Sequence, residues 1–217
     1  MKLQYWRARF DCVDGIIIFV AKQRDLEERL ERTEKQLRMF QKISRFMVRE
    51  MPLQDVLQGI VDLIVEFTAC DSCLLYLMED KELVLCASNT PHPSVIGKVR
   101  LKLNEGLTGW VARERRMVAI SREAFKDSRF KFFGDLPEDT YESFLSAPVI
   151  ARNRVVGVIN VQHRTPHAHS GNEMEVITTV GEQVGCLLVL ARMSSSAIEE
   201  ANHADLVLSS GPVTPRS

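Results

Sequence analysis

Cys70 and Cys73 are the first residues in this sequence whose types and spacing could do chemistry. Two intervening residues give the spacing of a redox pair or of one half of a zinc site. A structural zinc site needs four ligands, and the sequence has no second cysteine pair with this spacing. The pair also falls where a predicted helix ends and a predicted strand begins, which would point the sulfur atoms in different directions. We expect two buried thiols in a reducing compartment, with no redox or metal role.

His163, His167 and His169 form a second group, placed between a predicted strand and a predicted helix. Imidazole nitrogens are common ligands for zinc and other transition metals. No carboxylate or cysteine follows them before Glu173, however, and histidines in loops are usually just polar side chains. We therefore expect no metal site in this chain, and the sequence identifies no cofactor.

Signatures of other chemistry are missing, because the sequence has neither a nucleophile elbow nor a phosphate-binding loop. The 217 residues include 28 Lys and Arg against 29 Asp and Glu, so the formal net charge is -1. This balance gives no electrostatic footprint for nucleic acid or anionic lipid. No apolar run approaches the roughly 20 residues that a membrane-spanning helix needs. We expect a cytoplasmic protein that is not an enzyme and binds neither nucleic acid nor membrane.

A long helix is predicted for residues 22–51, since residues 22–50 contain no glycine or proline and many good helix formers. Positions spaced alternately by four and three form a seam in which Thr33 and Ser44 are the polar members. The apolar members are Leu26, Leu30, Leu37, Phe40 and Met47. This seam favours a coiled coil between two copies of the chain, although one helix packed on its own domain would also explain it. Residues 1–21 have no clean period and are assigned to a weakly defined lead.

The middle of the chain has the pattern of strands. A second helix starts near Pro52, and a hairpin then turns at residues 79–81. Residues 98–104 alternate between apolar and mostly basic side chains and lead through a glycine-marked turn into a short helix and a brief strand at 117–121. The loop at 122–142 is long, polar and aromatic, which is often a sign of function. A second hairpin turns at Arg152 and Asn153.

A closing helix begins at a capping box made by Ser170 and Glu173 and is expected to run to about Met193. The tail at 194–217 is rich in serine and is expected to be flexible. Strands in the middle of the chain, with helices before and after them, predict an α+β fold. We expect a central antiparallel sheet of five to six strands with helices on both faces, preceded by the long N-terminal helix.

Three stretches resemble the GAF domains, which are small-molecule sensory modules of signalling proteins. They are GKVRLKLNEGLTGWVARERRMVAI, YESFLSAPVIARNRVVGVINVQH and the helix that follows SGNEMEVITTVGEQVG. In this order and spacing they are similar to GAF modules of bacterial phosphotransferase-system regulators and nitrogen-fixation activators. The resemblance covers residues 53–192 and implies a GAF domain at 52–193, with the preceding helix similar to the signalling helices that join such modules into dimers.

The resemblance implies a ligand pocket on one face of the sheet, roofed by the short helix and the long loop. Gly106 and Gly109 would let the backbone turn tightly there. The candidate lining residues are Asn104, Thr108, Trp110, Ser121, Arg122, Tyr141 and Phe144. Trp110 and Phe144 also suit a hydrophobic core, and Arg122 also suits solvent. The expected partner in this pocket is a small molecule of unknown identity.

Some GAF proteins reduce free methionine sulfoxide with cysteines in the strand and turn that correspond to residues 98–109. This sequence has Arg100 and Leu101 in that strand and Thr108 in that turn, so the nucleophile is absent. A cysteine-based methionine sulfoxide reductase is therefore the weakest of three hypotheses. The first is a cytoplasmic signal-transduction module that binds a small molecule and relays its state through a dimeric helix to a separate output protein. The second is a dimerisation or docking module with a degenerate pocket.

Overall fold

The computed structural model describes residues 2–89, 95–130 and 141–209, in two compact units that comprise residues 1–42 and 43–217. Helix α1 (Lys2–Met47) supplies the whole described part of the first unit. The long helix expected from the sequence therefore lies within α1, which also takes in residues 2–21. The second unit contains the sheet and the remaining helices.

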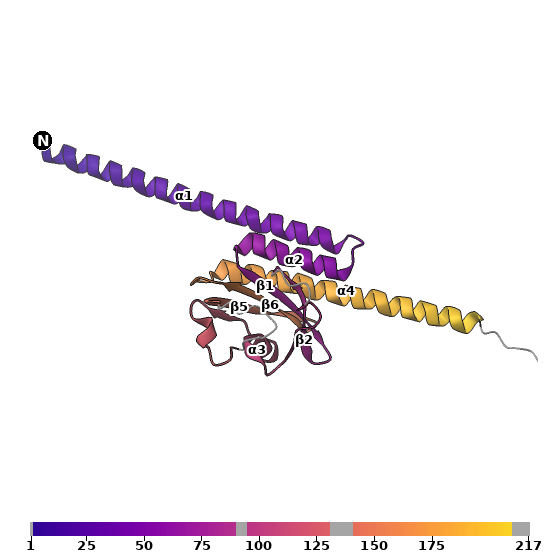
Figure 1. The fold of residues 1–217 in the computed structure, drawn as a ribbon. Helices are drawn as coiled ribbons and strands as arrows, with labels where there is room; N and C mark the ends of the chain where they lie inside the picture. The colour runs from indigo at the N-terminus through magenta and orange to yellow at the C-terminus, as the bar shows by residue number, and fades with distance from the viewer. Residues whose placement is uncertain (1, 90–94, 131–140, 210–217) are drawn as a thin grey trace, which may run out of the picture. The chain divides into compact units, whose positions relative to one another are not determined.

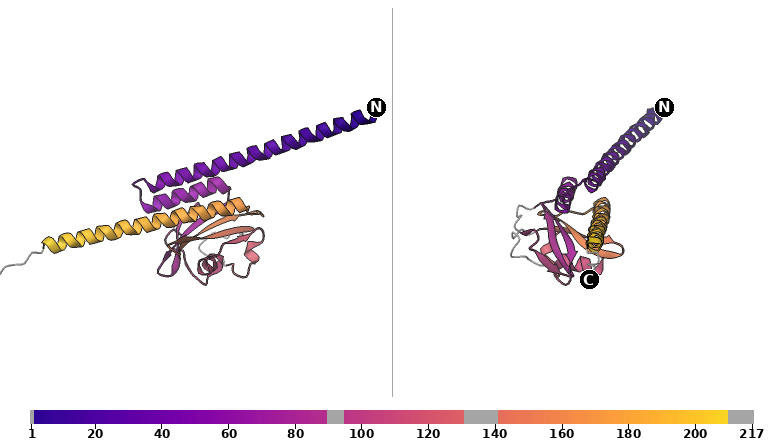
Figure 2. Two further views of the ribbon diagram at one scale, coloured as in Figure 1. Left: turned by 180° about the vertical axis from the view of Figure 1, so that it is seen from behind. Right: turned by 90° about the vertical axis from the view of Figure 1, so that its right-hand side faces the viewer.

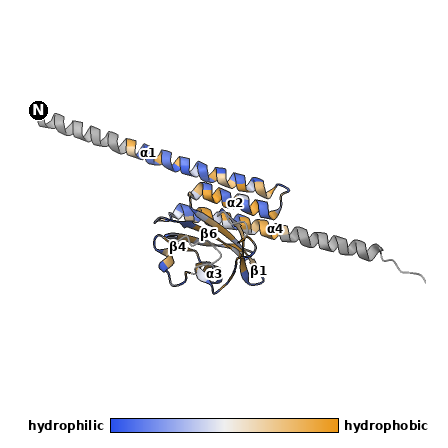
Figure 3. Cartoon of the chain, viewed as in Figure 1, coloured by the Kyte–Doolittle hydropathy of each residue, from blue (hydrophilic) through white to orange (hydrophobic). Residues whose placement is uncertain are grey.

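Helix α1 is largely hydrophilic along the part coloured in Figure 3. Against this background, Leu26, Leu30 and Leu37 of the predicted seam are 53%, 60% and 56% exposed. Val20 is 57% exposed as well. Large apolar side chains at regular helical spacing on an otherwise polar helix form the stripe that a partner element normally covers.

Two tight hairpins organise the sheet. Strands β1 (Ser72–Glu79) and β2 (Glu82–Ser88) meet at Asp80 and Lys81, and strands β5 (Ser143–Ala151) and β6 (Arg154–His163) meet at Arg152 and Asn153. All four turn residues have positive φ angles, between 44° and 71°. Two-residue turns of this kind match the twist of antiparallel strands, so both hairpins predicted from the sequence are confirmed.

The strands form a six-stranded antiparallel sheet in the order β3-β2-β1-β6-β5-β4, counted over the described ranges. The two edge strands, β3 (Arg100–Lys102) and β4 (Val118–Ile120), are short. Short edges limit pairing with another chain. The α+β fold and the antiparallel sheet expected from the sequence are confirmed.

Helices cover both faces of this sheet (Figures 1 and 2). Helices α2 (Leu53–Thr68) and α4 (Gly171–Ser209) pack on one face, and α3 (Gly106–Glu114) packs on the other. Within the long loop, a 3-10 turn covers Ala124–Lys126, while residues 131–140 lie outside the described ranges. The flexible tail predicted from residue 194 is wrong as far as Ser209, because α4 continues past the sheet to that residue.

Helix α4 explains why one segment of this chain is as apolar as a membrane span. Residues Gly171–Ala191 are long and apolar enough to cross a bilayer by length and composition alone. Val176, Ile177, Val180 and Val184 of this segment are buried within the domain, at 1% exposure or less. The helix packs along β5 and β6, so its composition is that of a core helix covering a sheet.

Candidate functional site

An apolar layer lies between the sheet and α3. Alternate residues of β1, β2 and β6 point into it and meet the buried side of α3. Its members include Tyr76, Leu85, Leu107, Val111 and Phe144. Burial of the Tyr76 hydroxyl in this layer raises the pKa of that group well above its usual range. This is the layer in which the family resemblance places a ligand.

Three hydrogen-bonded polar side chains interrupt this layer. The Ser146 hydroxyl donates to Asn160 Oδ1 at 2.7 Å, and Asn160 Nδ2 donates to Thr108 Oγ1 at 2.8 Å. All three residues are at most 5% exposed. The triad therefore links β5, β6 and α3, and it supplies hydrogen-bonding atoms in surroundings that are otherwise apolar.

Gln162 adds a fourth polar group to the same face of the sheet, because it lies two residues beyond Asn160 on β6. It is 7% exposed, and its Oε1 atom has no hydrogen-bond partner among the described residues. A buried carbonyl oxygen without a donor lowers the stability of the folded state by about 1–3 kcal/mol, so such groups are rare in protein cores.

We predict that replacing Asn160 with leucine lowers the free energy of unfolding by about 2 kcal/mol or more. Leucine has nearly the same size but leaves the Ser146 and Thr108 hydroxyls buried without their partner, and each unpaired group costs about 1–3 kcal/mol. Urea unfolding measures the loss. Removing all three partners together, in an Asn160→Leu, Ser146→Ala, Thr108→Val variant, should restore most of the stability. A triple variant less stable than the single one would contradict the role assigned to the triad.

Two glycines allow α3 to begin with a tight turn and to pack closely against the chain that leaves β3. Gly106 has a left-handed φ of 65°, and a Cβ on Gly109 would lie 2.4 Å from the backbone oxygen of Lys102. Both positions thus require glycine, one for its conformation and one for close packing. The turn expected at these residues is confirmed, and it holds Thr108 over Asn160.

The seven residues predicted to line a pocket divide into two sets. Phe144 and Thr108 are buried, and Trp110 is half-buried, in or against the layer under α3. Tyr141 is buried as well, but it is not a member of the apolar cluster under α3. The other three candidates are exposed, namely Asn104, Ser121 and Arg122. The structure therefore brings three of the seven together in one layer of the domain.

Trp110 is covered by a cation from the long loop. The guanidinium carbon of Arg129 lies 4.6 Å from the centre of the Trp110 ring, and Arg129 also makes a bidentate ion pair with Asp127 at 2.9 and 2.7 Å. Phe130 of the same loop meets Phe144 edge to face, with ring centres 6.4 Å apart. These contacts attach residues 127–130 to the layer beneath α3.

Ser146, Asn160 and Gln162 were not among the residues predicted from the sequence. The sequence did contain a sign of them. Each is a polar residue in β5 or β6 at a position where the alternation of the strand places the side chain in the core. A polar residue at such a position either pairs within the core or faces a ligand.

The cysteine pair is confirmed to straddle a boundary, since α2 ends at Thr68 and β1 begins at Ser72. Cys70 and Cys73 are free and buried, and burial raises the pKa of both thiols. Burial also raises the pKa of the Cys86 thiol. A raised pKa keeps a thiol protonated at neutral pH, which is the opposite of what a cysteine nucleophile needs.

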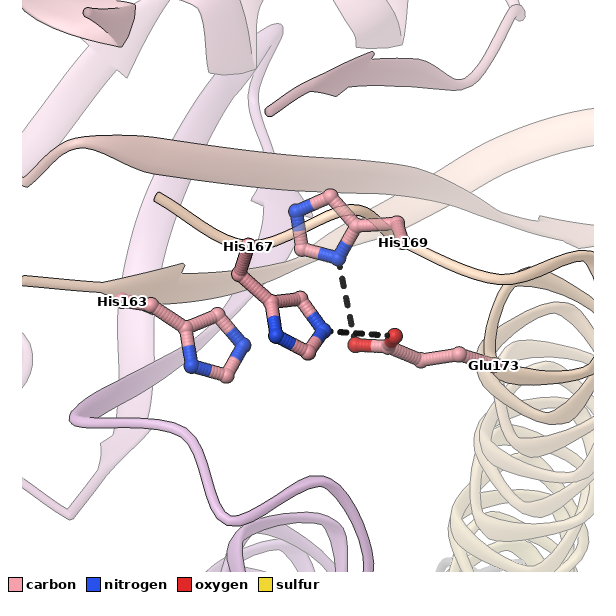
Figure 4. Close-up of side chains that lie close together, drawn as sticks. All are labelled: His163, His167, His169 and Glu173. Atoms are coloured by element: carbon pink, nitrogen blue, oxygen red, sulfur yellow. Dashed lines mark hydrogen bonds and ion pairs between the residues drawn. The ribbon is translucent and has the colours of Figure 1, made fainter. Parts of the chain in front are cut away.

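The histidines lie around a carboxylate, as Figure 4 shows. Nε2 of His167 is 3.0 Å from one oxygen of Glu173, and Nδ1 of His169 is 3.1 Å from the other. The ring of His163 stacks on that of His167, with centres 4.0 Å apart. Glu173 lies in the first turn of α4, where its backbone N–H donates to Ser170 Oγ at 3.1 Å, so the serine cap predicted from the sequence is confirmed.

The domain matches known proteins in both sequence and structure. The model of the GAF domain family matches residues 50–188. The crystal structure of the GAF domain from an Acinetobacter phosphoenolpyruvate-protein phosphotransferase is similar to this chain, at 28% identity and a TM-score of 0.65, over 74% of this chain and 97% of that one. No curated protein matches.

Two further solved structures share the fold at lower identity. The nlh2 GAF domain of A. aeolicus in an inactive state has 17% identity and a TM-score of 0.61, over 74% of this chain and 99% of that one. A free methionine-R-sulfoxide reductase of Neisseria meningitidis, in complex with its substrate, has 14% identity and a TM-score of 0.59, over 70% of this chain and 87% of that one. The family model covers more than half of the chain, and the resemblance seen in the sequence is confirmed: this protein belongs to the GAF domain family.

Proposed function

We propose that this protein is a cytoplasmic signalling module whose GAF domain binds a small molecule between the sheet and α3. The observation that carries the proposal is the row of buried polar groups on one face of the sheet. Ser146, Asn160 and Gln162 lie in an apolar layer, and the Gln162 oxygen has no donor among the described residues. Small-molecule sites combine apolar walls with a few placed polar groups in this way.

The same groups define the chemistry of the ligand. Gln162 Oε1 would accept a hydrogen bond from an N–H or O–H group of the ligand. Trp110 and Phe144 would contact an apolar or aromatic part of it. The nearby charged pair Arg129 and Asp127 is already neutralised. The expected ligand is a small polar molecule with a hydrogen-bond donor and an apolar or aromatic part.

Binding would be relayed through α1 in a homodimer, with a separate protein as the output. The exposed leucines of α1 support this part of the proposal, since pairing two copies of the helix would bury them. A ligand shifts such an equilibrium only to the extent that it binds one arrangement of the helices better than the other.

A purely structural dimerisation or docking module is the second candidate. It is favoured by the size of the apolar cluster under α3, in which Tyr76, Leu85, Leu101 and Val111 are at most 1% exposed. An enzyme that uses cysteine is disfavoured, because the pKa values of Cys70, Cys73 and Cys86 are raised by burial.

We predict that Gln162→Leu abolishes ligand binding without weakening the fold. Leucine removes a buried oxygen that has no donor, so the free energy of unfolding should stay the same or rise slightly. Thermal shift and isothermal titration against nucleotides, keto acids, amino acids and anions identify the ligand for the native chain, and the variant is titrated next.

Glu182→Gln is the control, because Glu182 is exposed on α4, which packs on the opposite face of the sheet, and its replacement should leave binding unchanged. If no compound in the panel raises the melting temperature of the native chain, and protein purified from cells carries no small molecule by native mass spectrometry, the docking module is the better interpretation. A Gln162→Leu variant that binds as tightly as the native chain would move the site away from this face of the sheet.

A further inference from the structure

Three imidazoles and one carboxylate converge where β6 leads into α4, on the face of the sheet opposite to α3. One ligand-type atom from each of His163, His167, His169 and Glu173 can be chosen so that all four lie within 4.8 Å of one another. Figure 4 shows His167 and His169 directed at the Glu173 carboxylate, with the His163 ring beside that of His167. We propose that these four residues form a binding site for a divalent transition metal, with Zn²⁺ as the best match.

An unpartnered nitrogen is the first observation in favour of a metal. His163 is 6% exposed, and its Nε2 atom has no hydrogen-bond partner among the described residues. Figure 4 shows the Nε2 side of this ring pointing toward His167 and Glu173. A buried nitrogen left without a partner is costly, and a metal ion at the centre of the cluster would supply that partner.

The spacing of the donor atoms is already close to that of a tetrahedral site. Zn–N and Zn–O distances of about 2.0–2.1 Å place tetrahedral ligand atoms roughly 3.3 Å apart. His167 Nε2 lies 3.0 Å from one oxygen of Glu173, and His169 Nδ1 lies 3.1 Å from the other. The four chosen ligand atoms lie within 4.8 Å of one another, so the longest separation would shrink by about 1.5 Å when the ion binds.

Backbone hydrogen bonds hold each ligand in place. His163 ends β6, where its carbonyl accepts from Glu142 N at 2.9 Å, and His167 N donates to Ser121 O at 2.9 Å. Glu173 is fixed by the Ser170 cap. Three of the four ligands are thus held by hydrogen bonds that do not involve the ion, which reduces the reordering that binding requires.

The ligand set distinguishes Zn²⁺ from the hard cations. Three imidazole nitrogens and one carboxylate oxygen suit zinc and its neighbours in the transition series, whereas Mg²⁺ and Ca²⁺ prefer sites made of oxygen. The side chain of His167 is 35% exposed, which gives an ion a way in from solvent. Four protein ligands leave no open position, so the site is structural and would tie the first turn of α4 to the end of β6.

The test is metal binding by the full chain after treatment with a chelator. Zn²⁺ is titrated in competition with a chromogenic chelator, and Co²⁺ replaces it as a spectroscopic probe. We expect one Zn²⁺ per chain, a visible absorption spectrum of four-coordinate Co²⁺, and a melting temperature about 5 °C or more higher when free Zn²⁺ exceeds its dissociation constant a hundred-fold.

His167→Ala and Glu173→Gln should each weaken Zn²⁺ binding at least ten-fold. His167 is half-exposed, so its variant keeps the fold even if the Glu173 variant does not. The control is Glu175→Gln, which neutralises an exposed carboxylate two residues from Glu173 on the same helix, and it should bind Zn²⁺ like the native chain. The proposal is overturned if no saturable binding occurs, if His167→Ala binds as tightly as the native chain, or if the control variant loses binding.

Discussion

Replacing both Leu30 and Leu37 with glutamate is expected to convert the homodimer proposed above into monomers. The two leucines are 60% and 56% exposed on α1 and belong to the seam along which two copies would pair. In a dimer the double substitution removes four buried leucines, each worth about 1.5–3 kcal/mol, and places four carboxylates in an apolar interface. The dimerisation constant should therefore fall at least a thousand-fold, as measured by sedimentation equilibrium.

Arg32→Gln together with Lys35→Gln is the matched control for that experiment. It changes the charge of each chain by the same two units, but at positions on the outer side of the same helix. The control should remain dimeric. If the Leu30→Glu, Leu37→Glu variant also remains dimeric, the contact between copies lies elsewhere in the chain, and the relay through α1 has to be abandoned.

Replacing Gly109 with alanine is expected to destabilise the domain by about 2–3 kcal/mol. The added methyl group would lie 2.4 Å from the Lys102 carbonyl oxygen and 3.2 Å from that of Leu103. These are backbone atoms, which cannot move aside as the end of a flexible side chain can. Alanine favours a helix over glycine by about 1 kcal/mol, which acts in the opposite direction. Overpacking of this severity costs more than that, so the net change is a loss.

Gly171→Ala isolates the effect of helix propensity. Gly171 is also helical, but a Cβ there would meet no atom within 4 Å. Its free energy of unfolding in urea should change by no more than about 0.5 kcal/mol. If Gly109→Ala proves as stable as Gly171→Ala, α3 does not sit directly on the chain that leaves β3.

Local patterns were sufficient to predict most of the fold. The hairpins could be predicted because polar turn residues, such as Arg152 and Asn153, interrupt apolar runs of strand length. Helix α3 could be placed because Gly106 and Gly109 mark its start. The ends of the long helices were harder, since helical residues outside a core leave no periodic signal, and α4 runs to Ser209.

The candidate sites could be predicted less well, because they depend on neighbours from distant parts of the sequence. Thr108 and Asn160 are 52 residues apart, and only the fold brings their side chains into hydrogen-bonding distance. Glu173 appeared too far along the chain from His163 to share a ligand set with it. The turn between β6 and α4 folds back, however, and the four donor groups come within 4.8 Å of one another.

Helix α4 joins the histidine cluster at one end to a segment that continues beyond the sheet at the other (Figure 1). It has 39 residues, so at 1.5 Å per residue it is about 58 Å long. The first half of α4 is held against the sheet by Val176, Val180 and Val184, so only the part beyond Leu188 is free to change direction. That part is about 30 Å long, and a change of about 5° in its direction would displace its end by about 3 Å.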